Sequence, residues 1–587
     1  MQEKLRDILF KDGINPPIAL AVACGSVTVV VLWKWVIRRE IQRKMNEARQ
    51  CRNDRLEQME KMAWKLKQKN PGIQSESILS LTLTELAEKL RDEKLSPESA
   101  LYTYITKALE VNQEVNCVTD FLHGCEEQLQ DLKKPKEKGL LYGIPVSIKE
   151  HIGYKGHIST CGLVQYIDKV EADDSVIVKV LKKQGAIPFV KTNIPQSMIN
   201  YDCSNLIFGQ TKNPLNHKKS PGGSSGGEGA LIAGGGSLLG FGTDVAGSIR
   251  LPSSFCGLCG LKPTGSRLST LGLASPVAGM KSVIATIGPM ARDVDSLALC
   301  MKALLCDELF HLDTSVPPLP FREEIYTSSN LLRIGYYTDD GYFQPSPSMK
   351  RAVQETKNLL QAAGHKLVPF VPPRLNYVVD ELFTRGIFSD GAANLLAKFK
   401  GDIVDPGLKS QINCYSIPIV LKRILALILK PVYPRIARDL NALCGVGSAK
   451  NLWKQHAAVA AYREEFIAEW RKLKLDVILC PVLGPAFNEG YPGKLFAATS
   501  YTNLYNVLNF PAGVVPVTNV TQADEEELKQ YKGHYADPWD KRLKEAVTDA
   551  VGLPVAVQCV ALAWQEELCL RFMKEVETLT CQNRLKA

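Results

Sequence analysis

The sequence predicts an α/β protein built on a mixed sheet. Residues 141–148 and 186–190 are short apolar runs typical of buried strands, and residues 175–184 between them have the pattern of a helix. Alternation of strands and helices is characteristic of layered α/β folds. The chain has 587 residues, of which 45% are hydrophobic and 23% charged, so its length and composition allow a large core.

The composition excludes several classes of function. The formal net charge of +9 is modest for this length and lacks the concentrated basic patch of a nucleic-acid-binding protein. The sixteen cysteines are scattered, and only residues 256–259 form a C-x-x-C pattern. Without a second pair or nearby histidines this is a poor zinc site, although a redox role stays open. We therefore expect no metal, no nucleic-acid partner and buried, reduced thiols.

An apolar segment near the N-terminus favours a membrane anchor. Residues 18–33 carry no charge before Lys34 interrupts them, which is short of the about 20 residues that a spanning helix needs. Trp33 and Trp35 suit the membrane–water interface. A cleaved signal peptide is the alternative, but basic residues follow in place of a small-residue cleavage site. We predict an uncleaved transmembrane anchor over residues 1–37, with the rest of the chain in the cytosol.

A helical linker region is predicted over residues 38–110. Residues 38–70 alternate charged and apolar side chains as a long amphipathic helix does, and Asn-Pro-Gly at 70–72 ends it. A capping-box pattern at 82–85 opens a second helix, and Ser96 begins a third. We expect these helices to pack on the catalytic domain and to take no part in chemistry.

The chain is organised around residues 220–251, which read SPGGSSGGEGALIAGGGSLLGFGTDVAGSIRL. Such a density of glycine indicates unusual backbone angles or close backbone packing. A flexible Gly/Ser linker would lack the apolar blocks. A phosphate loop would need Gly-Lys-Ser/Thr or G-x-G-x-x-G. Residues 222–226 match the G-x-S-x-G nucleophile elbow, but no strand is predicted before them and no histidine stands in a recognisable setting.

The combination of PGGSSGG with GTDxxGSIR resembles the amidase signature family of serine hydrolases. The resemblance covers about residues 100–575 and includes the stretch GIPVSIK at 143–149. It implies a large central mixed β-sheet wrapped by helices, which we assign to residues 111–580, and no cofactor. It also implies a catalytic set without histidine, in which Ser248 is the nucleophile, Ser224 the bridging serine and Lys149 the base.

Further site residues follow from the same motif. The resemblance implies an oxyanion hole formed by the backbone of Val245, Ala246, Gly247 and Ser248, where Ala246 replaces a glycine of many members. It implies a supporting set that holds the loops through hydrogen bonds: Ser225, Thr243, Asp244 and Arg250. Taken alone, Lys149 could instead pair with a carboxylate such as Glu150 or Asp244.

Within the family, the chain is most similar to the vertebrate membrane-bound members that cleave fatty-acid amides. Met198 and Phe388 correspond to positions that line an acyl channel in those enzymes. Ile199 and Asp439 stand where those enzymes often have phenylalanine. A lone carboxylate in a dry channel is costly, so the preferred acyl chain is left open.

Residues 416–443 are predicted to dock on a membrane. Residues 417–429 are apolar apart from Pro418, Lys422 and Arg423, and Pro431 should divide two short helices. Such helices are too short to span a bilayer, but a basic amphipathic pair can lie in its surface. A buried pair of core helices is the alternative. The membrane-bound relatives carry a docking cap at the matching place.

The expected function is hydrolysis of long-chain fatty-acid amides, and of esters, by a protein of endoplasmic-reticulum-type membranes that the resemblance suggests is a homodimer. Two alternatives stay open: an amidase for small soluble amides or peptides, and a non-catalytic membrane scaffold. The scaffold hypothesis draws on a P-x-x-P pattern within residues 314–320, which suits an SH3-type partner or a plain surface loop.

Overall fold

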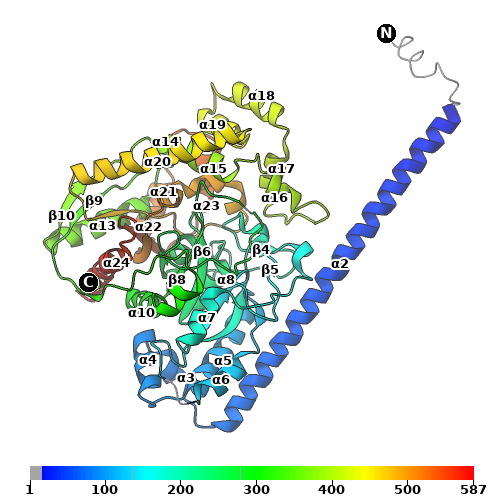
Figure 1. Cartoon of the computed structure of the whole chain (residues 1–587). Helices are drawn as coiled ribbons and strands as arrows, with labels where there is room; N and C mark the ends of the chain where they lie inside the picture. Colours follow the sequence, from blue (N-terminus) through cyan, green and yellow to red (C-terminus); the bar gives the residue numbers. More distant parts are fainter. Residues whose placement is uncertain (1–15, 135–136, 278, 587) are drawn as a thin grey trace.

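An eleven-stranded mixed sheet runs through the middle of the molecule. The computed structural model describes residues 16–134, 137–277 and 279–586 (Figure 1). The strands, in their order across the sheet, are β1 (Val118–Phe121), β3 (Ile187–Thr192), β2 (Pro145–Lys149), β6 (Leu239–Asp244), β8 (Thr286–Ala291), β7 (Cys259–Lys262), β12 (Ala512–Asn519), β13 (Pro554–Val560), β11 (Val477–Pro481), β9 (Arg333–Tyr336) and β10 (Lys366–Pro369). A separate ribbon pairs β4 (Ser204–Asn205) with β5 (Gly209–Gln210).

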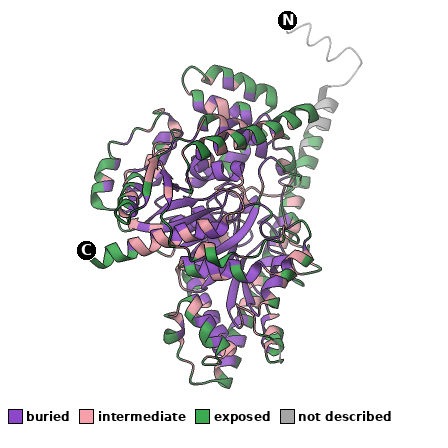
Figure 2. Ribbon diagram, turned by 60° about the vertical axis from the view of Figure 1, so that its left-hand side comes forward, coloured by how far each residue is buried: buried purple, intermediate pink, exposed green. Residues whose placement is uncertain are grey.

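The directions of the strands confirm the prediction of a mixed sheet. β2 runs parallel to β3 and β6, and β9 runs parallel to β10 and β11, whereas the other pairs are antiparallel. A helix connects β2 to β3 and another lies between β3 and β6, as parallel neighbours require. The central strands are almost entirely buried, so helices must cover both of their faces (Figure 2).

Helices surround the sheet. They are α2 (Pro16–Lys69), α3 (Ser75–Leu79), α4 (Leu83–Arg91), α5 (Pro97–Val115), α6 (Cys125–Leu132), α7 (Val176–Lys183), α8 (Gly226–Ala233), α9 (Arg250–Cys256), α10 (Val294–Leu304), α11 (Asp307–Leu312), α12 (Glu323–Tyr326), α13 (Pro347–Ala362), α14 (Leu375–Tyr377), α15 (Arg385–Ile387), α16 (Ala393–Ala397), α17 (Lys409–Ser416), α18 (Ile419–Leu429), α19 (Pro434–Ala442), α20 (Ala449–Lys472), α21 (Ser500–Leu508), α22 (Gln522–Leu528), α23 (Pro538–Ala546) and α24 (Glu566–Lys586). Short 3-10 turns cover Val164–Tyr166, Gln196–Met198, Pro492–Lys494 and Phe496–Thr499, and a π-helical segment covers Val378–Thr384.

The helices before the sheet belong to the same core as the sheet. The predicted capping box is present, because Thr82 Oγ1 accepts the Glu85 N–H and the Glu85 carboxylate accepts the Thr82 N–H. Ser96 caps α5, with Pro97 at the first helical position. Apolar side chains of α4 and α5, such as Leu86 and Ile105, join the main hydrophobic cluster. The prediction that these helices pack on the catalytic domain is therefore confirmed.

The predicted boundary between anchor and linker falls inside one helix. α2 is continuous for 54 residues, so residues 37 and 38 are neighbours on the same helix. From Ile41 onward it packs on the body, through side chains such as Met45 and Ala48, whereas Trp33 and Trp35 nearer its start are exposed. Figure 1 shows the start of the helix extending beyond the body. The first fifteen residues of the predicted anchor lie outside the described part of the chain.

Among the described residues, no single helix combines the length and apolar character needed to cross a membrane. Taken together, α17 and α18 reach that length and composition, but they meet at a bend of 102°.

The segment 416–443 forms the predicted pair of short helices, but its basic residues are distributed differently from the prediction. Pro431 separates α18 from α19 as expected. Most apolar side chains of α18 are exposed, whereas Ala426 is buried against α19, so the two helices are not a fully buried core pair. Lys422 points inward and donates to the carbonyls of Tyr415 and Leu443, and Arg435 is buried against acidic partners. Arg423 and Lys430 are exposed, so only part of the predicted basic face reaches the surface.

Candidate functional site

The end of one strand and two loops bring Lys149, Ser224 and Ser248 together. Lys149 is the last residue of β2, Ser224 precedes α8, and Ser248 lies between β6 and α9. Because β2 and β6 are parallel neighbours, their carboxyl ends open at the same edge of the sheet. The side chains of all three residues are buried, and Ser224 and Ser248 line the same cavity.

Lys149 is bonded to hydroxyls and not to carboxylates. Its Nζ lies 2.7 Å from Ser224 Oγ and 3.0 Å from Thr243 Oγ1. The alternative partners are occupied elsewhere, since Glu150 accepts backbone N–H groups of Thr160 and Cys161 and Asp244 pairs with Arg250. Burial lowers the pKa of Lys149 to about 7, against the smaller raising effect of Asp244 and other acidic groups. A substantial fraction of the amine is therefore neutral at neutral pH.

A buried ion pair ties the two ends of the loop that carries Ser248. Arg250 donates to both oxygens of Asp244, at 2.9 and 3.0 Å, and neither side chain has exposed surface. Asn506 Nδ2 also donates to Asp244 at 2.9 Å. Burial by itself would raise the pKa of Asp244, but the charge and hydrogen bonds of Arg250 hold it well below its usual range. The pair thus closes the turn around Ser248.

The backbone of this loop reduces the number of N–H groups that are free to form the predicted oxyanion hole. The N–H of Gly247 donates to Asp244 Oδ1 at 2.8 Å, so it is engaged already. The N–H groups of Val245, Ala246 and Ser248 have no hydrogen-bond partner among the described residues. Gly247 has φ +128°, and a Cβ there would stand 2.5 Å from Thr502 Oγ1. Ala246, which stands where many family members have glycine, is buried next to Gly247, so the loop has room for its methyl group.

Hydrogen bonds of Ser225 and close backbone packing at the glycines hold the loops of Ser224 and Ser248 together. The Ser225 N–H donates to the carbonyl of Ser248 at 3.2 Å, and Ser225 Oγ lies 3.3 Å from the N–H of Thr243. A Cβ at Gly227 would lie 2.3 Å from the backbone nitrogen of Asn193. The density of glycine therefore reflects close backbone packing. The peptide bond between Gly223 and Ser224 is cis.

A cavity of about 240 Å³ opens onto Ser248. Met198, Ile199 and Phe388 line it, as the sequence predicted, and apolar side chains such as Leu273 and Leu395 complete most of its wall. Asp439, whose effect on the channel the sequence left open, is not among the residues that line this cavity; it lies on α19, where its carboxyl group is hydrogen-bonded to Thr384. Its carboxyl group therefore imposes no cost on the cavity.

Sequence reasoning missed His151, which lines the same cavity. His151 Nδ1 lies 2.8 Å from the carbonyl oxygen of Ala274, and Nε2 lies 2.9 Å from Thr243 Oγ1. Thr243, predicted only to hold the loops, thus touches both Lys149 and His151. No local pattern pointed to it, because β2 ends at Lys149 and His151 lies in a turn closed by the Ile152 N–H, which donates to the carbonyl of Lys149.

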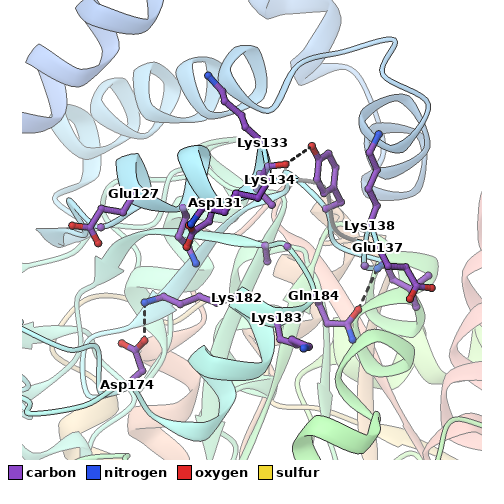
Figure 3. A pocket seen from close by; sticks show the side chains of 18 of the residues that line it. Glu127, Asp131, Lys133, Lys134, Glu137, Lys138, Asp174, Lys182, Lys183 and Gln184 are labelled. Atoms are coloured by element: carbon purple, nitrogen blue, oxygen red, sulfur yellow. Dashed lines mark hydrogen bonds and ion pairs between the residues drawn. The ribbon is translucent and has the colours of Figure 1, made fainter.

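A larger cavity, of about 1460 Å³, lies elsewhere and shares no lining residue with the one at Ser248. Figure 3 shows that lysines and carboxylates of α6, α7 and their loops alternate around it. Lys182 pairs with Asp174 at 2.7 Å, and Lys138 pairs with Glu93 at 2.8 Å. None of the predicted catalytic residues belongs to this cavity.

Comparisons with known proteins identify relatives of the whole chain. A family model described as Amidase matches residues 99–570. The chain is 71% identical over 457 residues to vitamin D3 hydroxylase-associated protein of Gallus gallus, covering 78% of this chain and 98% of that one. It is 52% identical over 572 residues to fatty-acid amide hydrolase 1 of Sus scrofa, covering 97% and 98%. A solved structure described as fatty acid amide hydrolase superposes with a TM-score of 0.76 at 26% identity, covering 93% of this chain and 96% of the other.

Proposed function

The chain belongs to the amidase signature family, and from that premise we propose that it is a membrane-docked serine hydrolase of long-chain fatty-acid amides. The observation that carries the proposal is the contact of the Lys149 amine with Ser224, at 2.7 Å, beside a largely apolar cavity that also exposes Ser248. The similarity to a fatty-acid amide hydrolase over almost the whole chain supports the same class of substrate.

In the proposed attack, protons move along Ser248, Ser224 and Lys149. A serine hydroxyl is a weak nucleophile and needs a base. Ser248 Oγ bonds to the carbonyl carbon as its proton passes to Ser224 Oγ, and Ser224 gives its own proton to the neutral amine of Lys149. The carbonyl oxygen becomes an oxyanion, for which the free N–H groups of Val245, Ala246 and Ser248 are candidate donors.

In the next step the proton transfers along these three residues are reversed. The Lys149 ammonium returns a proton through Ser224 to the nitrogen of the substrate, the C–N bond breaks and the amine leaves. An ester between the acyl group and Ser248 remains. Water then attacks this ester and gives its proton through Ser224 to Lys149. When the ester bond breaks, the proton returns to Ser248 and free fatty acid is released.

The apolar wall of the cavity favours a substrate with a lipid chain over a small soluble amide. Its wall is mostly aliphatic, with Met198, Ile387 and Phe388 close to the serines. A small polar amide gains little from such a wall, whereas each buried methylene of a chain contributes about 0.8 kcal/mol. The bonded pair of Lys149 and Ser224 also argues against the scaffold hypothesis, which has no use for a neutral lysine.

Two apolar surfaces support docking on a membrane. On α18, Val420, Leu427 and Ile428 are 70%, 73% and 63% exposed. On α2, Val29, Val31 and Trp33 are exposed too. In Figure 1 this end of the helix extends past the body on the side toward which α18 projects. Exposed apolar groups of this extent mark an interaction surface. We propose that both contact one bilayer.

The proposed location is the cytosolic face of endoplasmic-reticulum-type membranes. All sixteen cysteines are free thiols, which suits a reducing compartment. A homodimer and an SH3-type partner for residues 314–320 stay predictions. Light scattering of the detergent-solubilised protein tests the dimer.

The function is tested by hydrolysis of primary amides from acetamide to oleamide in mild detergent, with Ser248→Ala alongside. We expect the rate to climb steeply with chain length and to vanish in the variant. A flat profile lost in the variant would remove the lipid assignment and keep the catalytic set. Activity that survives in Ser248→Ala would overturn the nucleophile.

A further inference from the structure

We propose that His151 is a positioning residue, which fixes the direction of the Thr243 hydroxyl and thereby keeps the lone pair of Lys149 available to Ser224. The proposal rests on the proposed function, since it concerns the proton path of that reaction. It adds a histidine to a catalytic set for which none was expected.

The hydrogen bonds of His151 leave one arrangement of protons. A carbonyl oxygen only accepts, so the nitrogen that faces Ala274 O at 2.8 Å, Nδ1, must carry a proton. In a neutral imidazole Nε2 then has no proton and can only accept. Its partner at 2.9 Å is Thr243 Oγ1, so the hydroxyl hydrogen of Thr243 points to His151.

This arrangement determines the direction of the hydrogen bond between Lys149 and Thr243. With its hydrogen directed at His151, Thr243 Oγ1 offers Lys149 only lone pairs, and the contact at 3.0 Å must be an N–H of Lys149 donating to Thr243. A neutral amine has one lone pair. Since Thr243 does not use it, it is free to accept the proton of Ser224, which lies 2.7 Å away.

The opposite arrangement would block the reaction. If Thr243 turned its hydrogen toward Nζ, it would occupy the lone pair of Lys149 and leave the amine without basic character toward Ser224. Nothing in Thr243 alone prevents this, because a hydroxyl rotates to suit its neighbours. His151 removes the ambiguity by supplying an acceptor of fixed direction.

The surroundings keep His151 neutral. Burial lowers its pKa to about 3, and the nearby charges of Lys149 and Lys191 act in the same direction. The titratable groups that face Lys149 itself are the carboxyls of Asp244 and Glu228, the thiols of Cys161 and Cys203, and His151. His151 therefore works as a fixed acceptor and not as a proton donor during turnover.

A matched pair of variants tests the proposal. In His151→Asn, the side-chain amide can still donate to Ala274 O in the manner of Nδ1, but it is too short to accept from Thr243. In His151→Gln, the side-chain oxygen reaches the place of Nε2 and can accept from Thr243. Active sites are counted with a fluorophosphonate probe, which phosphonylates Ser248 with loss of fluoride, so that kcat refers to folded enzyme only.

We expect His151→Asn to lower kcat per active site roughly ten- to a hundredfold, as loss of an orienting partner typically does. The acid limb of its kcat/KM profile should move to lower pH, because a hydrogen bond from Thr243 to the free amine stabilises the neutral form of Lys149. His151→Gln should recover most of the rate. Thr243→Val removes the hydroxyl that could occupy the lone pair of Lys149, so the double variant with His151→Asn should turn over no more slowly than His151→Asn alone.

Other outcomes contradict the proposal. If both His151 variants turn over like the wild type per active site, or lose only thermal stability and the number of titratable sites, His151 has a structural role alone. A Gln variant as slow as the Asn variant also overturns it. His365→Asn is the control, since His365 is a buried histidine outside the site that accepts the Leu332 N–H; its kcat per active site should not change.

Failure of the proposed function looks different. In that case the wild-type enzyme itself hydrolyses no fatty-acid amide, or Ser248→Ala keeps the activity. The His151 variants are interpreted only against a wild type that turns over and loses its activity in Ser248→Ala.

Discussion

The amine of Lys149 and the hydroxyl of Ser224 are 2.7 Å apart in a fully buried setting, and the neighbouring carboxylates are bonded to other partners. This relationship supports the proposal that Lys149 is a base and argues against a lysine held in an ion pair. A lysine paired with a carboxylate would stay charged, whereas burial lowers the pKa of Lys149 to about 7.

The first prediction concerns pH. Lys149 must be neutral to accept a proton, and it is neutral above its pKa, so kcat/KM should rise with pH and level off above about 7. Activity is lost as the pH falls below that value. Lys149→Ala should lower kcat/KM roughly 10²–10⁴-fold and abolish this limb. Initial rates across pH 5–9 test both statements. An unchanged limb in the variant would assign it to another group.

The second prediction concerns the buried pair of Arg250 and Asp244. Arg250→Met leaves the carboxylate of Asp244 without its main partner, and breaking a buried pair in this way costs roughly 3–5 kcal/mol. We expect a clear fall in melting temperature together with loss of activity, because the pair closes the loop of Ser248.

The matched control for this pair is Lys302→Met. Lys302 pairs with Glu323 at the surface, where both side chains are about half exposed. Exposed pairs contribute little to stability, so the melting temperature should hardly move. Equal shifts for Arg250→Met and the control would show that the buried pair has no special weight.

The residues proposed for catalysis could be selected from the sequence because each of them stands in a local motif. Lys149, Ser224 and Ser248 each stand in a motif whose spacing fixes a strand end or a tight loop. The starts of α4 and α5 could be predicted for the same reason, since the capping groups of Thr82 and Ser96 lie within three residues of their partners.

Features that depend on distant segments could not be predicted in the same way. Lys422 looks like a surface charge in sequence, but it is buried against carbonyls of Tyr415 and Leu443. The sequence leaves the surroundings of Asp439 open, whereas in the structure it lies on α19 and its carboxyl group is hydrogen-bonded to Thr384. His151 acquires its role only through Ala274, which is 123 residues away.

The third prediction concerns chain length. Phe388 lines the cavity and packs against Tyr415 with ring centroids 4.6 Å apart. Phe388→Ala removes part of the apolar wall, so KM for oleamide should rise while the rate with acetamide changes little. Kinetics with the amide series test this. A uniform loss over all chain lengths would indicate a general disturbance of the site. Leu395→Ala serves as a second, smaller deletion in the same wall.

The last prediction concerns membrane docking by α18. In the double variant Leu427→Glu/Ile428→Glu, two exposed apolar side chains become charged. Each loses roughly 1.5–3 kcal/mol of burial in the bilayer, so partition onto vesicles should fall at least about tenfold, with the rest of the affinity supplied by α2. Vesicle sedimentation measures this, and hydrolysis of vesicle-embedded oleamide should fall in parallel while acetamide turnover persists. Val371→Glu is the control, because Val371 is 82% exposed but lies next to β10, away from α18. If the control weakens binding as much as the double variant does, general charge repulsion explains the effect and α18 has no particular role.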